Sequence, residues 1–299
     1  MSISLPKINL PTWVKTLIKL AVLAAIIFLI VRKIDERLLL RLMASVNPLW
    51  ILWAIVFFAL SKFIAAIRFN TLLRSDGIQL STLQNVKLYW LCMYYNLLLP
   101  GGISGDGYKI KVLMDQFQRP FKRLLAITLI DRISGMIALG QIGLVLMYFI
   151  PIIQPYRVWI IPALVASLVA IWFLYRIFKV EKVWWINTIQ SIGVQGAQAI
   201  ATMGLVIALD QLAQWADYII LFLVSSLVAM VPMTIGGAGA REITFLFGSK
   251  YLHIDPEKAV AIAFLFYLVS TFISFLGIIF SLKRNIFTIP NGNSSDRLK

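Results

Sequence analysis

The sequence predicts an all-α polytopic membrane protein with about six full transmembrane helices and two re-entrant helical hairpins in an inverted repeat. Three observations carry this prediction. The 299 residues are 60% hydrophobic and only 14% charged, whereas soluble domains carry about 25% charged residues. The apolar residues form continuous runs, not the alternating pattern of a transmembrane β-barrel. Two runs are interrupted by proline and glycine at matching places in the two halves of the chain.

Run length separates full spans from shorter elements, because a helix needs roughly 20 apolar residues to cross about 30 Å of hydrocarbon. Full spans are predicted near 13–31, 49–68, 123–150, 157–178, 187–209 and 259–282. Four runs are too short to cross, namely 85–99, 103–116, 218–231 and 239–249. They are joined in pairs by the two interruptions, so each pair is interpreted as a re-entrant hairpin. Asn47 and Pro48 are expected to cap the second span and form its first turn.

Basic residues give the orientation of these elements. Positive charges cluster before the third full span, at Lys109, Lys111, Arg119, Lys122 and Arg123. That end is therefore expected to be cytoplasmic, whereas 151–156 and the loop near Asp210 contain no lysine or arginine and should lie outside. The first hairpin then opens inward and the second outward, which is the layout of an inverted-repeat transporter. The basic segment 32–41 lies outside in this scheme and is interpreted as an amphipathic interfacial helix.

We expect one membrane domain over 1–299, with inverted halves near 13–150 and 157–282 and a cytoplasmic tail at 283–299. Both termini are expected in the cytoplasm, and the predicted location is the inner (plasma) membrane of a bacterial or archaeal cell. Net charge is +15, which in a membrane protein indicates contact with anionic lipid and not with nucleic acid. With one cysteine, Cys92, and one histidine, His253, we expect no disulfide, metal site, cofactor or catalytic residue.

The two interruptions are the main candidate for a binding site. Helices that begin after glycines present free N–H groups and partial positive charge, which suits a phosphate. The alternative is a simple tight turn between two ordinary helices. The candidate residues at these breaks are Pro100, Gly101, Gly102 and Gly105 in the first and Pro232, Gly236, Gly237 and Gly239 in the second.

Charged residues inside apolar sequence are the second candidate, because a lone charge at mid-membrane is costly. Asp131 and Arg132 point in different directions on a helix and each needs a partner elsewhere. The first hairpin offers such partners in Asp106, Lys109 and Lys111. Charge pairing that only fixes the packing is the alternative.

Other polar residues of the apolar runs have competing interpretations. Arg241 could bind phosphate while Glu242 caps its half-helix, or the two charges could simply solvate each other. Asn96 could hydrogen-bond either the broken backbone or a ligand. Lys62 and Arg68 are expected to extend to lipid phosphates at the inner end of their span. Gln190, Gln195 and Gln198 are expected to form interhelical hydrogen bonds.

These residues carry a family resemblance over essentially the whole chain. They are Arg68, Asn96 to Pro100, Gly102, Gly105, Asp106, Asp131-Arg132 with Gly135, Pro232, Gly236, Gly237, Gly239 and Glu242. In order and spacing the chain resembles the lysylphosphatidylglycerol synthase transmembrane-region family, also described as flippase-like membrane proteins. The resemblance implies lipid handling. Some relatives add a soluble aminoacyl-transferase domain, which is not expected here, so synthesis of lysyl-lipid is not expected either.

The sequence therefore predicts a lipid flippase or transporter that moves an anionic phospholipid or polyprenyl-phosphate-type lipid between leaflets. No nucleotide-binding motif is recognised, so a gradient or downhill scrambling would drive it. One alternative is a membrane-embedded transferase acting on a lipid or polyprenyl phosphate, with Asp106 or Asp131 as acid or base. Another is a non-transporting accessory subunit. The expected partners are an anionic membrane lipid, the bilayer, and either a second copy of the chain or a separate lipid-modifying enzyme.

Overall fold

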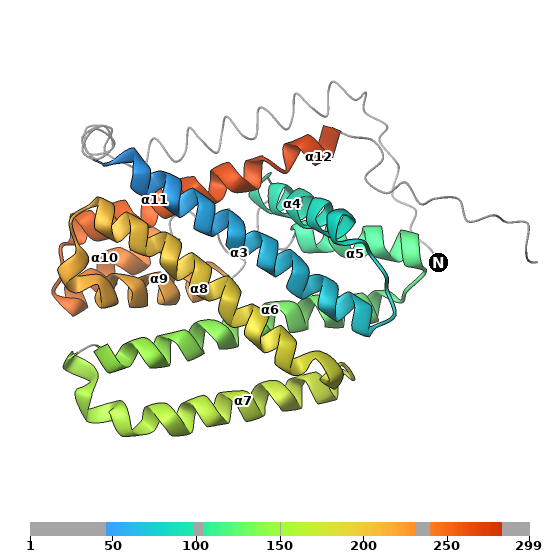
Figure 1. Ribbon diagram of the computed structural model, residues 1–299, viewed down its shortest axis with the longest axis horizontal. Helices are drawn as coiled ribbons and strands as arrows, with labels where there is room; N and C mark the ends of the chain where they lie inside the picture. Colours follow the sequence, from blue (N-terminus) through green and yellow to red (C-terminus); the bar gives the residue numbers. More distant parts are fainter. Residues whose placement is uncertain (1–45, 99–103, 150, 231–239, 283–299) are drawn as a thin grey trace, which may run out of the picture. The chain divides into compact units, whose positions relative to one another are not determined.

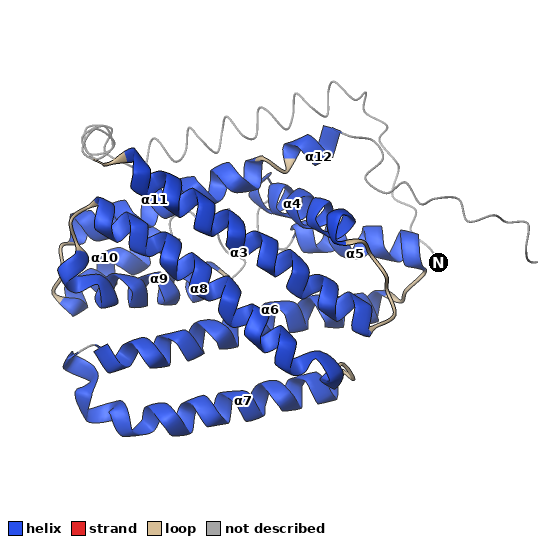
Figure 2. Ribbon diagram, viewed as in Figure 1, coloured by secondary structure: helices blue, strands red, loops and turns tan. Residues whose placement is uncertain are grey.

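The computed structural model describes residues 46–98, 104–149, 151–230 and 240–282, and their regular structure is helical throughout (Figures 1 and 2). The chain divides into two units, Met1–Ser45 and Val46–Lys299. The predicted span at 13–31, the basic segment 32–41, the turns of both hairpins and the tail at 283–299 lie outside the described residues.

The helices follow the predicted order of elements. They are α3 (Pro48–Ser75), α4 (Thr82–Leu98), α5 (Ser104–Phe117), α6 (Phe121–Leu146), α7 (Ile160–Ile177), α8 (Trp184–Ala208), α9 (Trp215–Ala229), α10 (Ala240–Leu252), α11 (Pro256–Phe275) and α12 (Ile278–Leu282). Short 3₁₀ segments lie at Met147–Phe149, Pro151–Trp159, Glu181–Val183 and Leu212–Gln214.

In the described part of the chain, six helical stretches are long and apolar enough to cross a membrane. They are Pro48–Ser75, Phe121–Phe149, Pro155–Ile177, Glu181–Ala208, Leu212–Ala229 and Pro256–Ser281. Five of them confirm predicted spans. The sixth corrects the prediction that 218–231 is too short to cross. The apolar run marks only its second part, because a 3₁₀ turn from Leu212 and the start of α9 at Trp215 extend it by several residues.

Local capping sets where two of the long helices begin. The side chain of Asn47 accepts a hydrogen bond from the backbone N–H of Leu49 at 3.0 Å, and Pro48 opens α3. Asp255 caps α11 in the same way, accepting from Glu257 N at 2.9 Å and Lys258 N at 3.2 Å. The predicted Asn47-Pro48 start is therefore confirmed, because this pair satisfies an N–H group that has no partner within the helix.

The most extensive helix contact joins α3 to α8, which run antiparallel alongside each other (Figure 1). At one end the indole N–H of Trp53 donates to the carbonyl of Ile200 at 3.1 Å. Further along, the side chain of Asn187 donates to the carbonyl of Arg68 at 3.1 Å. Gly204 faces the Trp53 ring, so the absence of a side chain there permits the close approach. Small residues at such contacts are typical of helix packing in membranes.

The helices assigned to each predicted hairpin pack against each other, α4 against α5 and α9 against α10. In the first pair the rings of Tyr95 and Tyr108 lie 4.6 Å apart. In the second pair Gly248 lies against the side chain of Leu221. Their re-entrant depth in a bilayer stays a prediction.

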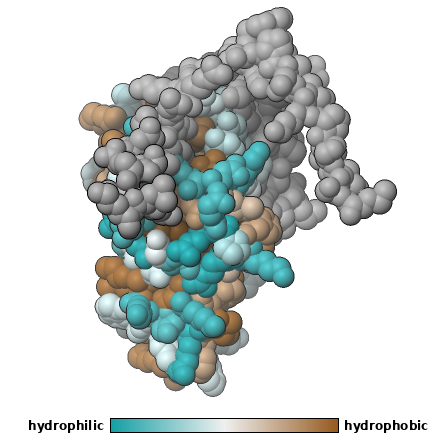
Figure 3. Space-filling model, turned by 90° about the vertical axis from the view of Figure 1, so that its right-hand side faces the viewer, coloured by the Kyte–Doolittle hydropathy of each residue, from teal (hydrophilic) through white to brown (hydrophobic). Residues whose placement is uncertain are grey.

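One end of the helices is held by an ion-pair cluster. Asp76, just after α3, accepts a hydrogen bond from the Arg123 guanidinium at 2.5 Å, and its carbonyl accepts from Arg119 at 2.8 Å. Arg123 also donates to the carbonyl of Phe178 after α7 at 2.6 Å. Figure 3 looks at this end and shows hydrophilic residues gathered over it. Exposed cations near these helix ends are Arg74, Lys122, Arg176, Lys179 and Lys182.

Candidate functional site

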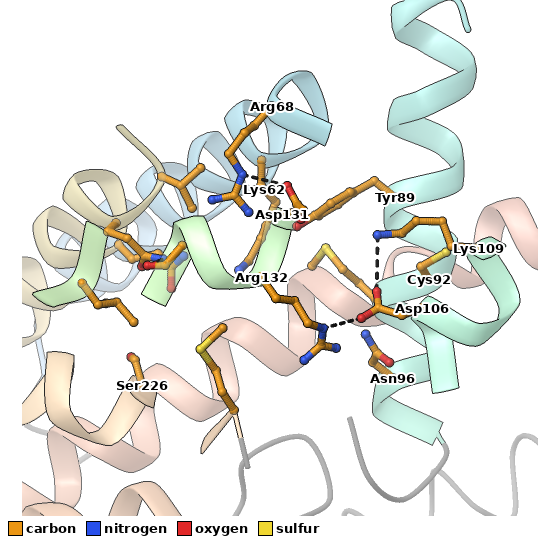
Figure 4. Close-up of a pocket in the computed structure, with 18 of the residues that line it drawn as sticks. Lys62, Arg68, Tyr89, Cys92, Asn96, Asp106, Lys109, Asp131, Arg132 and Ser226 are labelled. Carbon is orange, nitrogen blue, oxygen red and sulfur yellow. Dashed lines mark hydrogen bonds and ion pairs between the residues drawn. The ribbon is translucent and has the colours of Figure 1, made fainter. Parts of the chain in front are cut away.

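A cavity of about 230 Å³ lies between the helices, with walls from α3, α4, α5, α6, α8, α9 and α10 (Figure 4). Both predicted halves of the chain therefore contribute to it. Its lining comprises Lys62, Ala65, Arg68, Tyr89, Cys92, Met93, Asn96, Asp106, Lys109, Asp131, Arg132, Gly135, Leu139, Val194, Gln195, Gln198, Ser226, Met230 and Arg241.

The lining is strongly cationic. It includes five basic side chains and two carboxylates, so its formal charge is +3. The cations are Lys62, Arg68, Lys109, Arg132 and Arg241, and the carboxylates are Asp106 and Asp131. A charge inside a membrane costs about 2.5–3.5 kcal/mol on insertion scales unless it is compensated, and such residues usually mark a functional pathway.

Arg68 forms a buried ion pair with Asp131. The guanidinium Nε lies 2.8 Å from the carboxylate Oδ1, and Nη1 donates to the Ser191 hydroxyl at 3.2 Å. Each residue is only 5% exposed. The expectation that Arg68 extends to lipid phosphates is therefore wrong, because α3 continues for seven residues to Ser75 and keeps Arg68 inside. Gly135 leaves room for this pair, since a Cβ there would stand 3.2 Å from Arg68 Nη1.

Asp106 is shared by two cations. It lies in the first turn of α5, and its carboxylate pairs with the Arg132 guanidinium and with Lys109 Nζ at 3.3 Å (Figure 4). The Lys109 ammonium also lies 4.1 Å from the centroid of the Phe69 ring. The predicted partnership of Arg132 with the first hairpin is confirmed. Asp131 instead pairs with α3, while Lys111 is exposed on α5.

At the start of α5, one backbone N–H and one hydroxyl are hydrogen-bonded to α4. The Gly105 N–H donates to the side-chain oxygen of Asn96 at 2.7 Å, and the Ser104 hydroxyl donates to the carbonyl of Tyr95 at 3.1 Å. Asn96 was expected to hydrogen-bond either the backbone or a ligand, and the structure shows the bond to the backbone. Gly105 packs so closely on α4 that a Cβ there would collide with the Cys92 carbonyl. The cavity therefore presents side-chain cations at this point, and the Gly105 amide is already engaged.

Arg241 reaches the cavity from α10. Its Nη1 donates to the hydroxyls of Ser226 at 3.0 Å and Ser225 at 3.3 Å, and its guanidinium lies 5.0 Å from the Phe266 ring centroid. Glu242 lies in the first turn of α10, where a carboxylate is favourable to the helix dipole. Glu242 does not line the cavity.

The glutamines of α8 divide between packing and the cavity. Gln195 donates to the carbonyl of Gly135 at 3.2 Å, and Gln190 donates to Thr71 at 3.3 Å, which confirms interhelical hydrogen bonding for both. Gln198 lines the cavity.

Several candidates are not placed, and several lining residues were not predicted. Pro100, Gly101, Gly102, Pro232, Gly236, Gly237 and Gly239 lie outside the described residues. Lys62, Tyr89, Cys92 and Ser226 line the cavity without having been assigned to a site. Lys62, a cation in the middle of an apolar run, was expected to extend to lipid phosphates, whereas the structure places it in the cavity lining. The others have side chains that fit equally well in an ordinary helix contact.

Both carboxylates that the transferase alternative would use as acid or base are engaged in ion pairs. Asp131 is held by Arg68, and Asp106 is held by Arg132 and Lys109. Both carboxylates of the lining therefore serve as ion-pair partners of the cavity cations.

Apolar helices of spanning length around a cationic cavity define a multi-pass integral membrane protein. A family model, the lysylphosphatidylglycerol synthase TM region, matches residues 16–184 and 175–277. Because these matches cover most of the chain, the protein belongs to this family, as the resemblance predicted. Its setting is thus the membrane and its lipids. A search of curated proteins and a search of solved structures gave no match.

Proposed function

We propose that this protein is a lipid flippase or transporter that moves an anionic lipid between the leaflets of the membrane. The headgroup enters the cavity, and the hydrocarbon chain stays in the surrounding lipid. The observation that supports this proposal most directly is the formal charge of +3 on a cavity lined by membrane helices. Such a cavity favours anions, because the positive side chains that line it attract negative charge and a concave surface concentrates their field.

The order of the helices supports alternating access to this cavity. In the first half, α3 precedes the α4–α5 pair and α6, and in the second half α8 precedes the α9–α10 pair and α11. The equivalent helices α3 and α8 pack antiparallel, as inversion would require. Inverted repeats let a central site open to each side of a membrane in turn. We place both termini in the cytoplasm and leave the driving force to a gradient or to downhill scrambling.

A reconstitution assay tests this function. The full-length protein is placed in phosphatidylcholine liposomes that contain traces of fluorescent phosphatidylglycerol, phosphatidic acid, a polyprenyl phosphate or phosphatidylcholine. Dithionite then reports the fraction of label in the outer leaflet over time. We expect at least one anionic lipid to exchange faster than in protein-free liposomes, while labelled phosphatidylcholine does not. If every anionic lipid exchanged as slowly as in protein-free liposomes, the proposal would be contradicted.

An isosteric variant connects the transport to the cavity. Gln198→Glu adds one carboxylate to the lining and so lowers its positive charge. Repulsion of about 1.4 kcal/mol would slow the exchange of an anionic lipid about tenfold. Gln79→Glu makes the same change at an exposed position outside this cavity and should leave the rate unchanged.

A further inference from the structure

Two cations of the cavity, Lys62 and Arg241, differ from the other three. Arg68, Lys109 and Arg132 each pair with a carboxylate. Neither Lys62 nor Arg241 has a carboxylate partner within the ranges that the structure describes. These two side chains are therefore the cations of the lining without a direct ion pair to a described residue, and they are called uncompensated in this sense.

Two aromatic rings that contact each other lie beside the two cations. The Lys62 ammonium lies 4.5 Å from the centroid of the Phe58 ring, and the Arg241 guanidinium lies 5.0 Å from that of Phe266. The Phe58 and Phe266 rings are themselves in edge contact, with centroids 5.4 Å apart. One aromatic pair thus contacts both cations. Cation–π contacts stabilise each charge but leave the repulsion between the two uncompensated.

The Arg241 guanidinium has donors left for a ligand. Its hydrogen bonds to described residues all start from Nη1 and end on the hydroxyls of Ser225 and Ser226. Nε and Nη2 form no hydrogen bond with a described residue. An arginine fixed through one nitrogen keeps a planar pair of N–H groups, which matches the oxygens of a phosphate.

We propose that Lys62 and Arg241 together bind the headgroup of a phosphate monoester lipid and select it over phosphodiester lipids. This inference rests on the proposed function, because it takes the cavity to receive a lipid headgroup. A phosphate monoester carries about −1.5 to −2 charges at pH 7, which matches the two uncompensated cations. A phosphodiester carries one charge and leaves a cation uncompensated. A zwitterionic headgroup would also bring a cation into a cavity that is already positive.

Size and apolar lining point to the same class. At about 230 Å³ the cavity is smaller than the roughly 300–1,000 Å³ of typical small-molecule sites. A compact phosphate fits this space better than a headgroup that bears a sugar. Leu139, Met93 and Met230 add apolar surface beside the charges. Inorganic phosphate has the same headgroup chemistry but makes no use of that surface.

Equilibrium binding tests the selectivity. The full-length protein is incorporated into phosphatidylcholine nanodiscs, and radiolabelled dioctanoyl phosphatidic acid is compared with dioctanoyl phosphatidylglycerol at pH 7.5. The two probes differ in the phosphate ester and share their chains. We expect phosphatidic acid to bind at least about tenfold more tightly, because one further charge-assisted contact forms. Inorganic phosphate is expected to compete only weakly.

Variants assign this selectivity to the two cations. Lys62→Gln and Arg241→Gln should each reduce the preference for phosphatidic acid by most of that factor, and the double variant should abolish it. Lys111→Gln and Arg74→Gln remove the same charges at exposed positions outside the cavity and should not change it. Lys62→Arg keeps the charge and should retain the preference, which separates loss of charge from loss of folding.

Three results would overturn the inference, namely equal affinity for the two lipids, a preference unchanged in the double variant, or inorganic phosphate competing as well as the lipid.

The transport assay separates this inference from the proposed function. Exchange of both anionic lipids without preference would refute the phosphate monoester inference and leave the transport function standing. Selective binding without any exchange would support the inference and contradict transport.

Discussion

At the scale of single residues, two carboxylates organise the positive side chains of the cavity. Asp131 fixes Arg68 between α3 and α6, and Asp106 draws Lys109 and Arg132 together between α5 and α6. Each carboxylate compensates cations that would otherwise repel each other inside a membrane domain. The charge that is left over gives the lining a formal charge of +3, which supports the proposed binding of an anion.

Removing one partner of the buried pair should destabilise the protein strongly. Asp131→Asn leaves the Arg68 guanidinium with the Ser191 hydroxyl as its neutral partner. We expect the free energy of unfolding to fall by about 3–5 kcal/mol, because an uncompensated charge stays buried. Denaturant titration in mixed micelles measures this change, with Asp115→Asn, an exposed carboxylate of α5, as the matched control.

The double variant Arg68→Met with Asp131→Leu completes this prediction. Replacing both charges by apolar groups of similar size should restore most of the lost stability, because no unpaired charge is then buried. If the double variant is as unstable as Asp131→Asn, the ion pair is not the reason for the loss.

The sequence predicts which charged residues line the site more readily than which residue each of them pairs with. That Asp131 and Arg132 must find separate partners follows from helix geometry alone, and Asp106 is indeed one of them. The pairing of Asp131 with Arg68 joins positions 63 residues apart. It depends on how α3 packs against α6, which no local pattern encodes. Arg68 also looked like the end of a span, because polar residues follow it, although the helix continues.

At the scale of helices, glycines decide how closely the pairs approach. Gly105 lies directly against the Cys92 carbonyl, so α4 and α5 touch through backbone atoms. Asn96 then closes the pair by accepting from the Gly105 N–H. This contact positions the first turn of α5 and, with it, Asp106. The packing of α4 against α5 and the geometry of the cavity are therefore coupled.

Two glycines of α5 provide a matched test of this contact. Gly105→Ala places a methyl group into the Cys92 backbone, and we expect a loss of about 1–3 kcal/mol in stability through overpacking. Gly107→Ala adds a methyl group that meets no atom within 4 Å and should be neutral or stabilising, since alanine favours a helix. Thermal unfolding of both variants in detergent compares them. Equal effects would mean that the α4–α5 contact does not require Gly105.

The helices themselves could largely be predicted, because length and apolarity are properties of a continuous segment. Asn47-Pro48 marked the start of α3 correctly. The boundary at Leu212 was not predicted, since Gln211 and Gln214 are polar and the apolar run begins only later. The break between α11 and α12 also escaped prediction. It lies at Gly277, which packs against the backbone of Trp90, a contact between distant parts of the chain.

At the scale of the whole described unit, the two ends of α6 lie in different surroundings. Its first turn joins Asp76 and Phe178 through Arg123, in a region rich in exposed cations. Its last residues pack with the start of α9 and the end of α10, where Leu146 and Leu252 meet Ala216. Twenty-six residues of helix separate these ends by about 39 Å. That distance is enough to place them on opposite sides of a membrane.

Cysteine labelling tests this arrangement together with the orientation. In a Cys92→Ser background, single cysteines replace Lys122 and Lys179 at the cationic end and Asp210 and His253 at the other, all of them exposed. An impermeant maleimide is applied to intact cells and to permeabilised cells. We expect positions 210 and 253 to react in intact cells, and positions 122 and 179 to react only after permeabilisation, because lysine and arginine are retained in the cytoplasm.

The labelling experiment has one control, and two different outcomes would contradict the expectation. Ala54→Cys, at a fully buried position of α3, should react in neither condition and reports nonspecific labelling. A fully reversed pattern would overturn the orientation while leaving the packing intact. Reaction of 122 and 179 from different sides would contradict the structure itself, because Arg123 ties the two segments together through Asp76 and the Phe178 carbonyl. The expected pattern would put the cationic cavity between two opposite membrane faces, as exchange of a lipid headgroup between leaflets requires.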